Sequence, residues 1–161
     1  TRLGLVWLQV REPGNALLDR LADVLGLALP QAPNTSTGQE PVALWIAPEE
    51  WLLMGDESGA EGLGLRISEA LEGSLAHAGN VSDSRAGFRI SGPKAVSLLT
   101  KGCGLDLHSE EFPEGSCAGT RFAGLSALLH HTGEAESYRL YVDRSYADYL
   151  WDWLNRAAQE L

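Results

Sequence analysis

The sequence predicts an α+β domain of two successive split βαβ (ferredoxin-like) units, with helices packed on a mainly antiparallel sheet. Three observations lead to this prediction. The chain has 161 residues and is 44% hydrophobic, which is enough for one domain with a sizeable core over residues 1–161. Strand and helix patterns follow nearly the same order in its two halves. No low-complexity tract or break in composition separates a second domain.

The first half begins with a strand and a helix. Residues 3–10 form a short apolar run that is typical of a buried strand. Asn15 can cap a helix whose apolar residues recur at helical spacing, and Gly26 ends that helix. Residues 30–41 are rich in Pro, Asn, Ser, Thr and Gly, which predicts a flexible surface loop.

A hairpin, a helix and a strand complete this half. Residues 42–47 and 50–54 favour two strands around a turn. Ser58 and Glu61 have the spacing of a capping box, which opens a helix. The apolar face of this helix carries Leu63, Ile67, Ala70, Leu71 and Leu75. A strand at 80–84 is expected next.

The second half nearly repeats this order. Residues 87–91 alternate as a strand, and Pro93 suits the first position of a helix. After an irregular stretch at 102–119, the expected elements are strands at 120–122, 126–131 and 137–142 and a helix from about residue 145. In the last strand apolar residues alternate with Arg139 and Tyr141, which predicts a sheet with one face in solvent.

The charge balance excludes some partners. Twelve basic against 22 acidic side chains give a formal net charge of −10. A nucleic-acid backbone requires a basic surface, so we expect no nucleic-acid partner. No apolar run approaches the roughly 20 residues of a membrane-spanning helix, so we expect no membrane association and a cytoplasmic protein.

One short pattern resembles a catalytic dyad. Asp106 and His108 are two residues apart and point the same way in an extended segment, as a general base with its orienting carboxylate would. The alternative is a polar face between two leucines, which we favour because such short matches are mostly accidental. Cys103 and Cys117 lack zinc-site spacing, and we expect buried reduced thiols, with a single disulfide as the alternative.

Two adjacent histidines do not form a simple metal site. On a strand, His130 and His131 face opposite sides, so we expect one inward and one in solvent. The glycines around Cys103 match neither GxGxxG nor GxxxxGK, the patterns of phosphate-binding loops. The residues alone therefore predict no catalytic, cofactor-binding or metal-binding position.

The C-terminal helix has an unusually wide apolar arc. Its central stripe consists of Tyr146, Leu150, Trp153, Leu154 and Ala157. With Tyr149 on one flank and Trp151 on the other, the arc spans roughly 200°, against about 100° for a helix that covers one core. Either the helix is sunk in a groove of its own domain, or one flank contacts a partner. The candidate partner-interface residues are Tyr149, Trp151 and Trp153.

Several blocks of sequence resemble one family, the γ subunit of heterotetrameric sarcosine oxidase. They are residues 44–53, 81–85, 91–93, 101–108, 112–121 and 143–154, and the resemblance covers most of the chain between Leu3 and Ala158. Each block is weak alone, but together and in this order they are specific.

The resemblance implies both a fold and a function. It implies a fold like the folate-binding domain of the glycine-cleavage aminomethyltransferases. It also implies a complex that oxidises sarcosine to glycine, with tetrahydrofolate as the acceptor of the methylene group. The alpha and beta subunits, together with delta, would be the partners, and FAD, FMN, NAD and tetrahydrofolate would be bound by those other subunits. No cofactor and no active site are expected on this chain.

The leading hypothesis is therefore a non-catalytic structural subunit needed for assembly of that complex. The alternative is a free-standing domain that binds folate or another one-carbon small molecule. In isolation the chain can also pair with itself through its aromatic arc, which makes a homo-oligomer a further expectation. A small hydrolase based on Asp106 and His108 is the third hypothesis, and it requires a perturbed histidine in a cleft.

Overall fold

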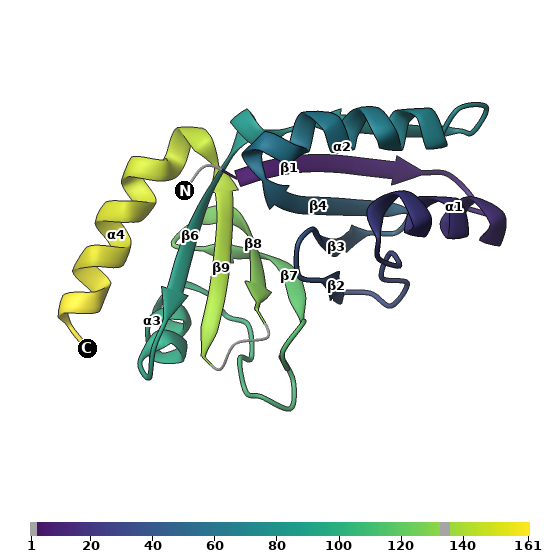
Figure 1. Ribbon diagram of the computed structural model, residues 1–161. Coiled ribbons are helices and arrows are strands. Elements are labelled where there is room, and N and C mark those ends of the chain that lie inside the picture. The colour runs from purple at the N-terminus through teal and green to yellow at the C-terminus, as the bar shows by residue number, and fades with distance from the viewer. Residues whose placement is uncertain (1–2, 133–135) are drawn as a thin grey trace. The chain divides into compact units, whose positions relative to one another are not determined.

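The computed structural model describes residues 3–132 and 136–161, and the chain divides into two compact units, residues 1–82 and 83–161 (Figure 1). Each unit has an antiparallel sheet with helices packed on it. The α+β class and the antiparallel pairing predicted from the sequence are confirmed. The strands form two sheets, one in each unit.

The first unit has a five-stranded sheet and two helices. Its elements are β1 (Leu3–Val10), α1 (Asn15–Leu25), β2 (Ser36–Gly38), β3 (Val42–Ala47), β4 (Glu50–Asp56), α2 (Glu57–Ala70) and β5 (Ala76–Asn80). The strand order is β2-β3-β4-β1-β5, with every neighbouring pair antiparallel. Thus β1 and β3 run parallel with β4 between them, and β4 and β5 run parallel with β1 between them. Both are split βαβ connections, as predicted.

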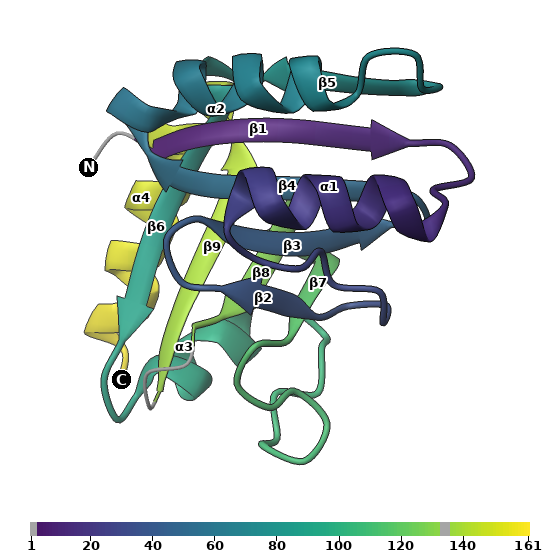
Figure 2. The same ribbon diagram turned by 45° about the vertical axis from the view of Figure 1, so that its right-hand side comes forward.

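Both helices of the first unit cover the same face of its sheet (Figure 2). The helical period turns Leu21 of α1 and Ile67 of α2 inward. They pack with Leu8 and Leu53, which come from β1 and β4, and all four side chains are fully buried. This burial of alternate strand positions against two amphipathic helices forms the core of the unit.

The segment 30–41 is not the flexible loop that its composition predicts. It contains β2, in which Ser36 lies opposite Leu44 of β3. In addition, the indole Nε1 of Trp51 donates a hydrogen bond to the carbonyl of Pro30 at 2.8 Å. The polar composition hid this order because it comes from pairing with β3 and from one buried indole, not from local strand propensity.

Element ends in the first unit shift by a few residues. α1 begins after Gly14 with no side-chain cap, so Asn15 is not the cap, whereas Gly26 ends the helix at φ +69° as predicted. α2 ends at Ala70, and Leu75 is 82% exposed instead of lying on the helix face. The strand expected at 80–84 is β5, which ends at Asn80 and precedes the short η1 (Ser82–Ser84). The predicted capping box of Ser58 and Glu61 lies outside the described side chains.

The second unit has a four-stranded sheet. Its elements are β6 (Arg85–Ser91), α3 (Ala95–Gly102), β7 (Cys117–Phe122), β8 (Leu125–His131), β9 (Ser137–Asp143), η2 (Arg144–Tyr146) and α4 (Ala147–Gln159). The order β6-β9-β8-β7 is antiparallel throughout, so β7, β8 and β9 follow one another as a meander. α3 connects the two edge strands, which run antiparallel, and in this respect the unit differs from the first.

The second sheet is covered more completely than the sequence predicts. Leu129 and Leu140 pack with Leu99 of α3 and Leu150 of α4 in a core of fully buried side chains. Tyr141, on the other face of β9, was expected in solvent, but it is also fully buried. The one-solvated-face prediction is therefore wrong at this strand. Alternation along a strand shows which residues share a face, but it does not show what covers each face.

A close contact at the end of α3 generates a stability prediction. A Cβ on Gly102 would lie 2.4 Å from the ring of Phe122, which is fully buried and cannot move aside. We expect Gly102→Ala to lower the free energy of unfolding by about 1–3 kcal/mol, although alanine normally favours a helix. Urea unfolding of the full chain measures this.

The matched control for this substitution is Gly104→Ala. A Cβ on Gly104 meets nothing within 4 Å. The control should therefore be neutral or stabilising by up to about 1 kcal/mol, because alanine restricts the unfolded chain. Equal stability of the two variants would contradict the proposed contact with Phe122.

Candidate functional site

α4 rests on the second sheet by a narrow buried stripe. Leu150, Leu154 and Ala157 are buried, and Trp153 is half-buried with its ring edge-on to Phe122 at 5.1 Å between centroids. Asp143 accepts hydrogen bonds from the Ser145 amide at 2.9 Å and hydroxyl at 2.6 Å, and these bonds lower the pKa of Asp143. Asp143 thus caps η2 at the start of the C-terminal segment. The buried stripe holds the inner face of α4 against the sheet.

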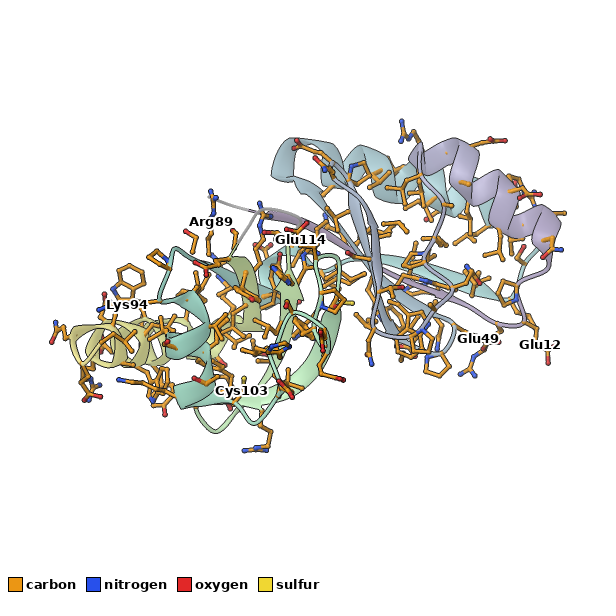
Figure 3. The ribbon with its side chains drawn as sticks, turned by 90° about the horizontal axis from the view of Figure 1, so that it is seen from below. Glu12, Glu49, Arg89, Lys94, Cys103 and Glu114 are labelled. Atoms are coloured by element: carbon orange, nitrogen blue, oxygen red, sulfur yellow. The ribbon has the colours of Figure 1, made fainter. Side chains whose placement is uncertain are left out.

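The other end of α4 is held by lysines of the α3 segment. Lys101 Nζ donates to the Ala157 carbonyl and to the Glu160 carboxylate, both at 3.1 Å. Lys94 donates to the Leu161 carbonyl (Figure 3). Cations at a helix C-terminus also interact favourably with the helix dipole. The helix is therefore held at both ends.

Large aromatic rings remain exposed on both flanks of this fixed helix. Tyr149 is 49% and Trp151 59% exposed. Tyr146 was expected in the central stripe, but it lies in η2 before the helix and is 48% exposed, so that expectation is wrong. Tyr149 donates through its hydroxyl to the Ala123 carbonyl at 3.1 Å. On the opposite flank, Trp151 stacks on Phe88 of β6 at 6.5 Å and 26°. The helix is not sunk in a groove of its own unit, because these rings stay on its surface in defined positions.

The catalytic dyad suggested by the sequence is absent at the residues concerned. The Asp106 carboxylate accepts a hydrogen bond from the backbone amide of His108 at 3.0 Å, and the imidazole Nδ1 accepts from the Glu110 amide at 3.4 Å. His108 is exposed. The two side chains stabilise a turn, so the structural alternative applies. The pair is not a catalytic dyad, and the hydrolase hypothesis has no site at these residues.

The cysteines and the histidine pair have structural environments. Neither cysteine is in a disulfide: Cys117 is fully buried, and Cys103 is half-buried and donates to the Leu99 carbonyl at 3.4 Å. The reduced state was predicted. His130 and His131 face opposite sides of β8, but both are buried, so the expectation of one solvated ring is wrong. No group of three metal-ligating side chains occurs among the described residues.

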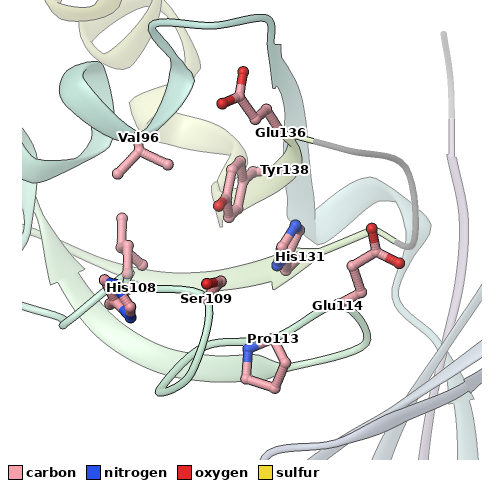
Figure 4. Close-up of a pocket in the computed structure, with 9 residues that line it drawn as sticks. Val96, His108, Ser109, Pro113, Glu114, His131, Glu136 and Tyr138 are labelled. Carbon is pink, nitrogen blue, oxygen red and sulfur yellow. The ribbon is translucent and has the colours of Figure 1, made fainter.

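A pocket of about 650 Å³ lies in the second unit beside His131 (Figure 4). Its apolar wall comes from Val96 and Leu107. Its polar lining includes Tyr138 and the glutamates Glu114 and Glu136. His108 also lines it, without a catalytic partner. The sequence did not single out this pocket because its lining comes from α3, the loop before β7, and the ends of β8 and β9.

A solved structure of low sequence identity shows the class of the fold. Glycine cleavage system aminomethyltransferase T from Bartonella henselae is similar to this chain, with a TM-score of 0.72 and 13% identity over 95% of this chain and 43% of that chain. At this identity the likeness shows the fold alone. The chain shares its fold with the matching part of that aminomethyltransferase chain, in agreement with the fold that the sequence resemblance implied.

The family follows from closer matches. The profile described as "Sarcosine oxidase, gamma subunit family" matches residues 12–160. Sarcosine oxidase subunit gamma from Corynebacterium sp. (strain U-96) is 32% identical over 154 residues, which are 92% of this chain and 72% of that protein. A chain of the heterotetrameric sarcosine oxidase from Corynebacterium sp. U-96, solved with pyrrole 2-carboxylate, has a TM-score of 0.91 and 29% identity, covering 99% of this chain and 81% of its own. This chain belongs to the sarcosine oxidase gamma subunit family.

Within the part of the chain that the structure describes, no helix is both long enough and apolar enough to cross a bilayer.

His130 generates a pH prediction. Burial, the Arg139 guanidinium and then His131 lower the pKa of His130 from 6.5 to about 4. Between these values the unfolded chain binds a proton that the folded chain does not. Stability from this group is therefore complete above pH 6.5 and decreases as the pH falls toward 4, by roughly 2 to 3 kcal/mol.

Urea unfolding at pH 7.5 and pH 4.5 measures this loss, with His130→Gln as the control without a titrating group. The variant should lose less stability than the parent chain between the two pH values, by the amount given above. An equal loss in both proteins would show that His130 is not held neutral in the folded state.

Proposed function

We propose that this chain is a non-catalytic structural subunit that assembles a heterotetrameric sarcosine oxidase. The observation that carries the proposal is the near-complete structural match to a chain of the Corynebacterium heterotetrameric enzyme. Residues 1–161 serve as one gamma-subunit-like domain in a cytoplasmic complex. Its partners are the alpha and beta subunits, together with delta.

In this proposal the other subunits carry out the reaction. They bind FAD, FMN, NAD and tetrahydrofolate and oxidatively demethylate sarcosine to glycine, with tetrahydrofolate as the methylene acceptor. The role of this chain is to contribute contact surface. Its sequence contains no dinucleotide-binding glycine pattern, in agreement with a division of labour in which the cofactors belong to the partners.

The partner contact is assigned to the two flanks of α4. Tyr149 and Trp151 expose about half of their surface although their rings are held in place, so little side-chain entropy is lost when a partner covers them. Tyrosine and tryptophan dominate the energetics of protein interfaces. Trp153 contributes its exposed portion next to Tyr149 while its ring packs on Phe122.

Replacing both flanks tests the proposed interface. We expect Tyr149→Ser/Trp151→Ser to reduce co-purification with the alpha and beta subunits at least tenfold, because each aromatic anchor is worth roughly 2 kcal/mol in binding. Circular dichroism of the isolated variant should match that of the parent chain, since neither ring is part of the buried core.

The matched control is Asp148→Ser/Gln159→Ser, two exposed positions on the same helix. It should leave assembly intact. The two single aromatic variants then identify which flank is covered. Unchanged complex formation by the aromatic double variant would overturn the interface assignment.

A titration separates the assembly role from the alternative of a folate-binding domain. Tetrahydrofolate added to the isolated chain should give no saturable micromolar binding if the chain is a structural subunit. Saturable binding would favour the free-standing folate domain instead. Sedimentation of the isolated chain, with the aromatic double variant alongside, measures self-association through the same rings.

A further inference from the structure

The pocket beside His131 has features of a binding site that are independent of the proposed assembly role. His131 is only 7% exposed and lines the pocket (Figure 4). Its Nδ1 lies 3.0 Å from the Phe112 carbonyl, and because a carbonyl can only accept, Nδ1 carries the hydrogen. In the neutral ring this leaves Nε2 as a hydrogen-bond acceptor.

Nε2 of His131 is buried and has no hydrogen-bond partner among the described residues. Leaving a buried polar atom unpaired costs about 1–3 kcal/mol. The ring cannot turn easily to relieve this cost, because it is stacked against Phe112 at 5° and against Tyr138 at 18°, with centroids 6.4 and 4.4 Å away. A ligand that brings an N–H group would supply the missing donor.

The loop around His131 brings a carboxylate to the pocket. The Gly115 amide donates to the His131 carbonyl at 2.9 Å, and the His131 amide donates to the Ser116 carbonyl at 2.8 Å. These two bonds tie the loop to β8 through the backbone amide and carbonyl of His131. Glu114, next to Gly115 in this loop, is thereby held at the pocket, where Figure 4 places its side chain near His131.

A second carboxylate comes from the turn residue that precedes β9. Glu136 lines the pocket next to Tyr138, and its backbone carbonyl accepts from the Gly92 amide at 3.2 Å. Burial and then the Glu136 carboxylate raise the pKa of Tyr138, so the phenol stays protonated at neutral pH. Among the lining residues that the structure describes there is no lysine or arginine.

The charges of Glu114 and Glu136 indicate the charge of the ligand that this pocket would bind. Two carboxylates, with no basic residue in the described part of the lining, would repel an anion and attract a cation. A metal ion is not the candidate, since no cluster of three ligating side chains exists within the described ranges. The walls from Val96, Leu107 and Pro113 are apolar and suit a compact hydrocarbon body.

We propose that this pocket binds a small organic cation, namely a protonated amine on a compact apolar body. The ammonium group donates a hydrogen bond to His131 Nε2, and its charge lies toward Glu114 and Glu136. The apolar body packs against Val96 and Leu107.

Histidine-selective ¹⁵N NMR of the full chain tests this with three probes of one shape: benzylamine, benzyl alcohol and benzoate. Benzylamine should shift the Nε2 resonance of His131 saturably. Benzyl alcohol, which lacks the charge, should bind about tenfold more weakly, and benzoate should not bind. No saturable shift with benzylamine, or equal affinity for the amine and the alcohol, would overturn the proposal.

A variant of the buried His131 could fail to fold, so the second test changes the two carboxylates at the rim of the pocket, Glu114 and Glu136. Glu114→Gln/Glu136→Gln should raise the benzylamine Kd about tenfold. Glu110→Gln/Glu111→Gln makes the same charge change on exposed residues of the neighbouring loop that do not line the pocket. Equal effects of the two double variants would show that the rim carboxylates do not contact the amine, and the proposal would fail.

Discussion

The narrow contact of α4 with its sheet determines the surface of the second unit. Leu150 and Leu154 bury one side of the helix, while Lys101 holds its last turn through the Ala157 carbonyl. A helix that covers one core needs an apolar stripe of about 100°, whereas the apolar arc here is twice as wide. The rings beyond the covered portion, Tyr149 and Trp151, must therefore stay in solvent or meet another protein. Their fixed positions make the second outcome less costly in entropy.

Most of the fold could be predicted from the sequence because the main elements have strong periodicity. The strand at residues 3–10 and the C-terminal helix have long apolar patterns, and both were found with nearly correct ends. β2 was missed, because Ser36–Gly38 has no strand signal of its own and pairs only because β3 offers an edge. Tyr141 was misplaced because alternation cannot show that both faces of a sheet are covered.

The candidate sites could be predicted only in part. The exposed rings of α4 follow from helical geometry, so Tyr149 and Trp151 were identified by spacing alone. The pocket depends on the stacking of His131 between Phe112 and Tyr138, which joins three separate segments. A double histidine in a strand was its one signal in the sequence, and that signal does not show which ring nitrogen lacks a partner.

The three-residue strand β2 has a consequence for solubility. Without it, β3 would form the edge of the first sheet, and its run Val-Ala-Leu-Trp-Ile-Ala would offer unpaired amides to any extended chain nearby. β2 pairs with the first half of that run, and at Gly38, which has φ +78°, the backbone enters the turn that leads into β3. Such a short outer strand is a poor template for growth by strand addition, so it protects an apolar sheet from aggregation.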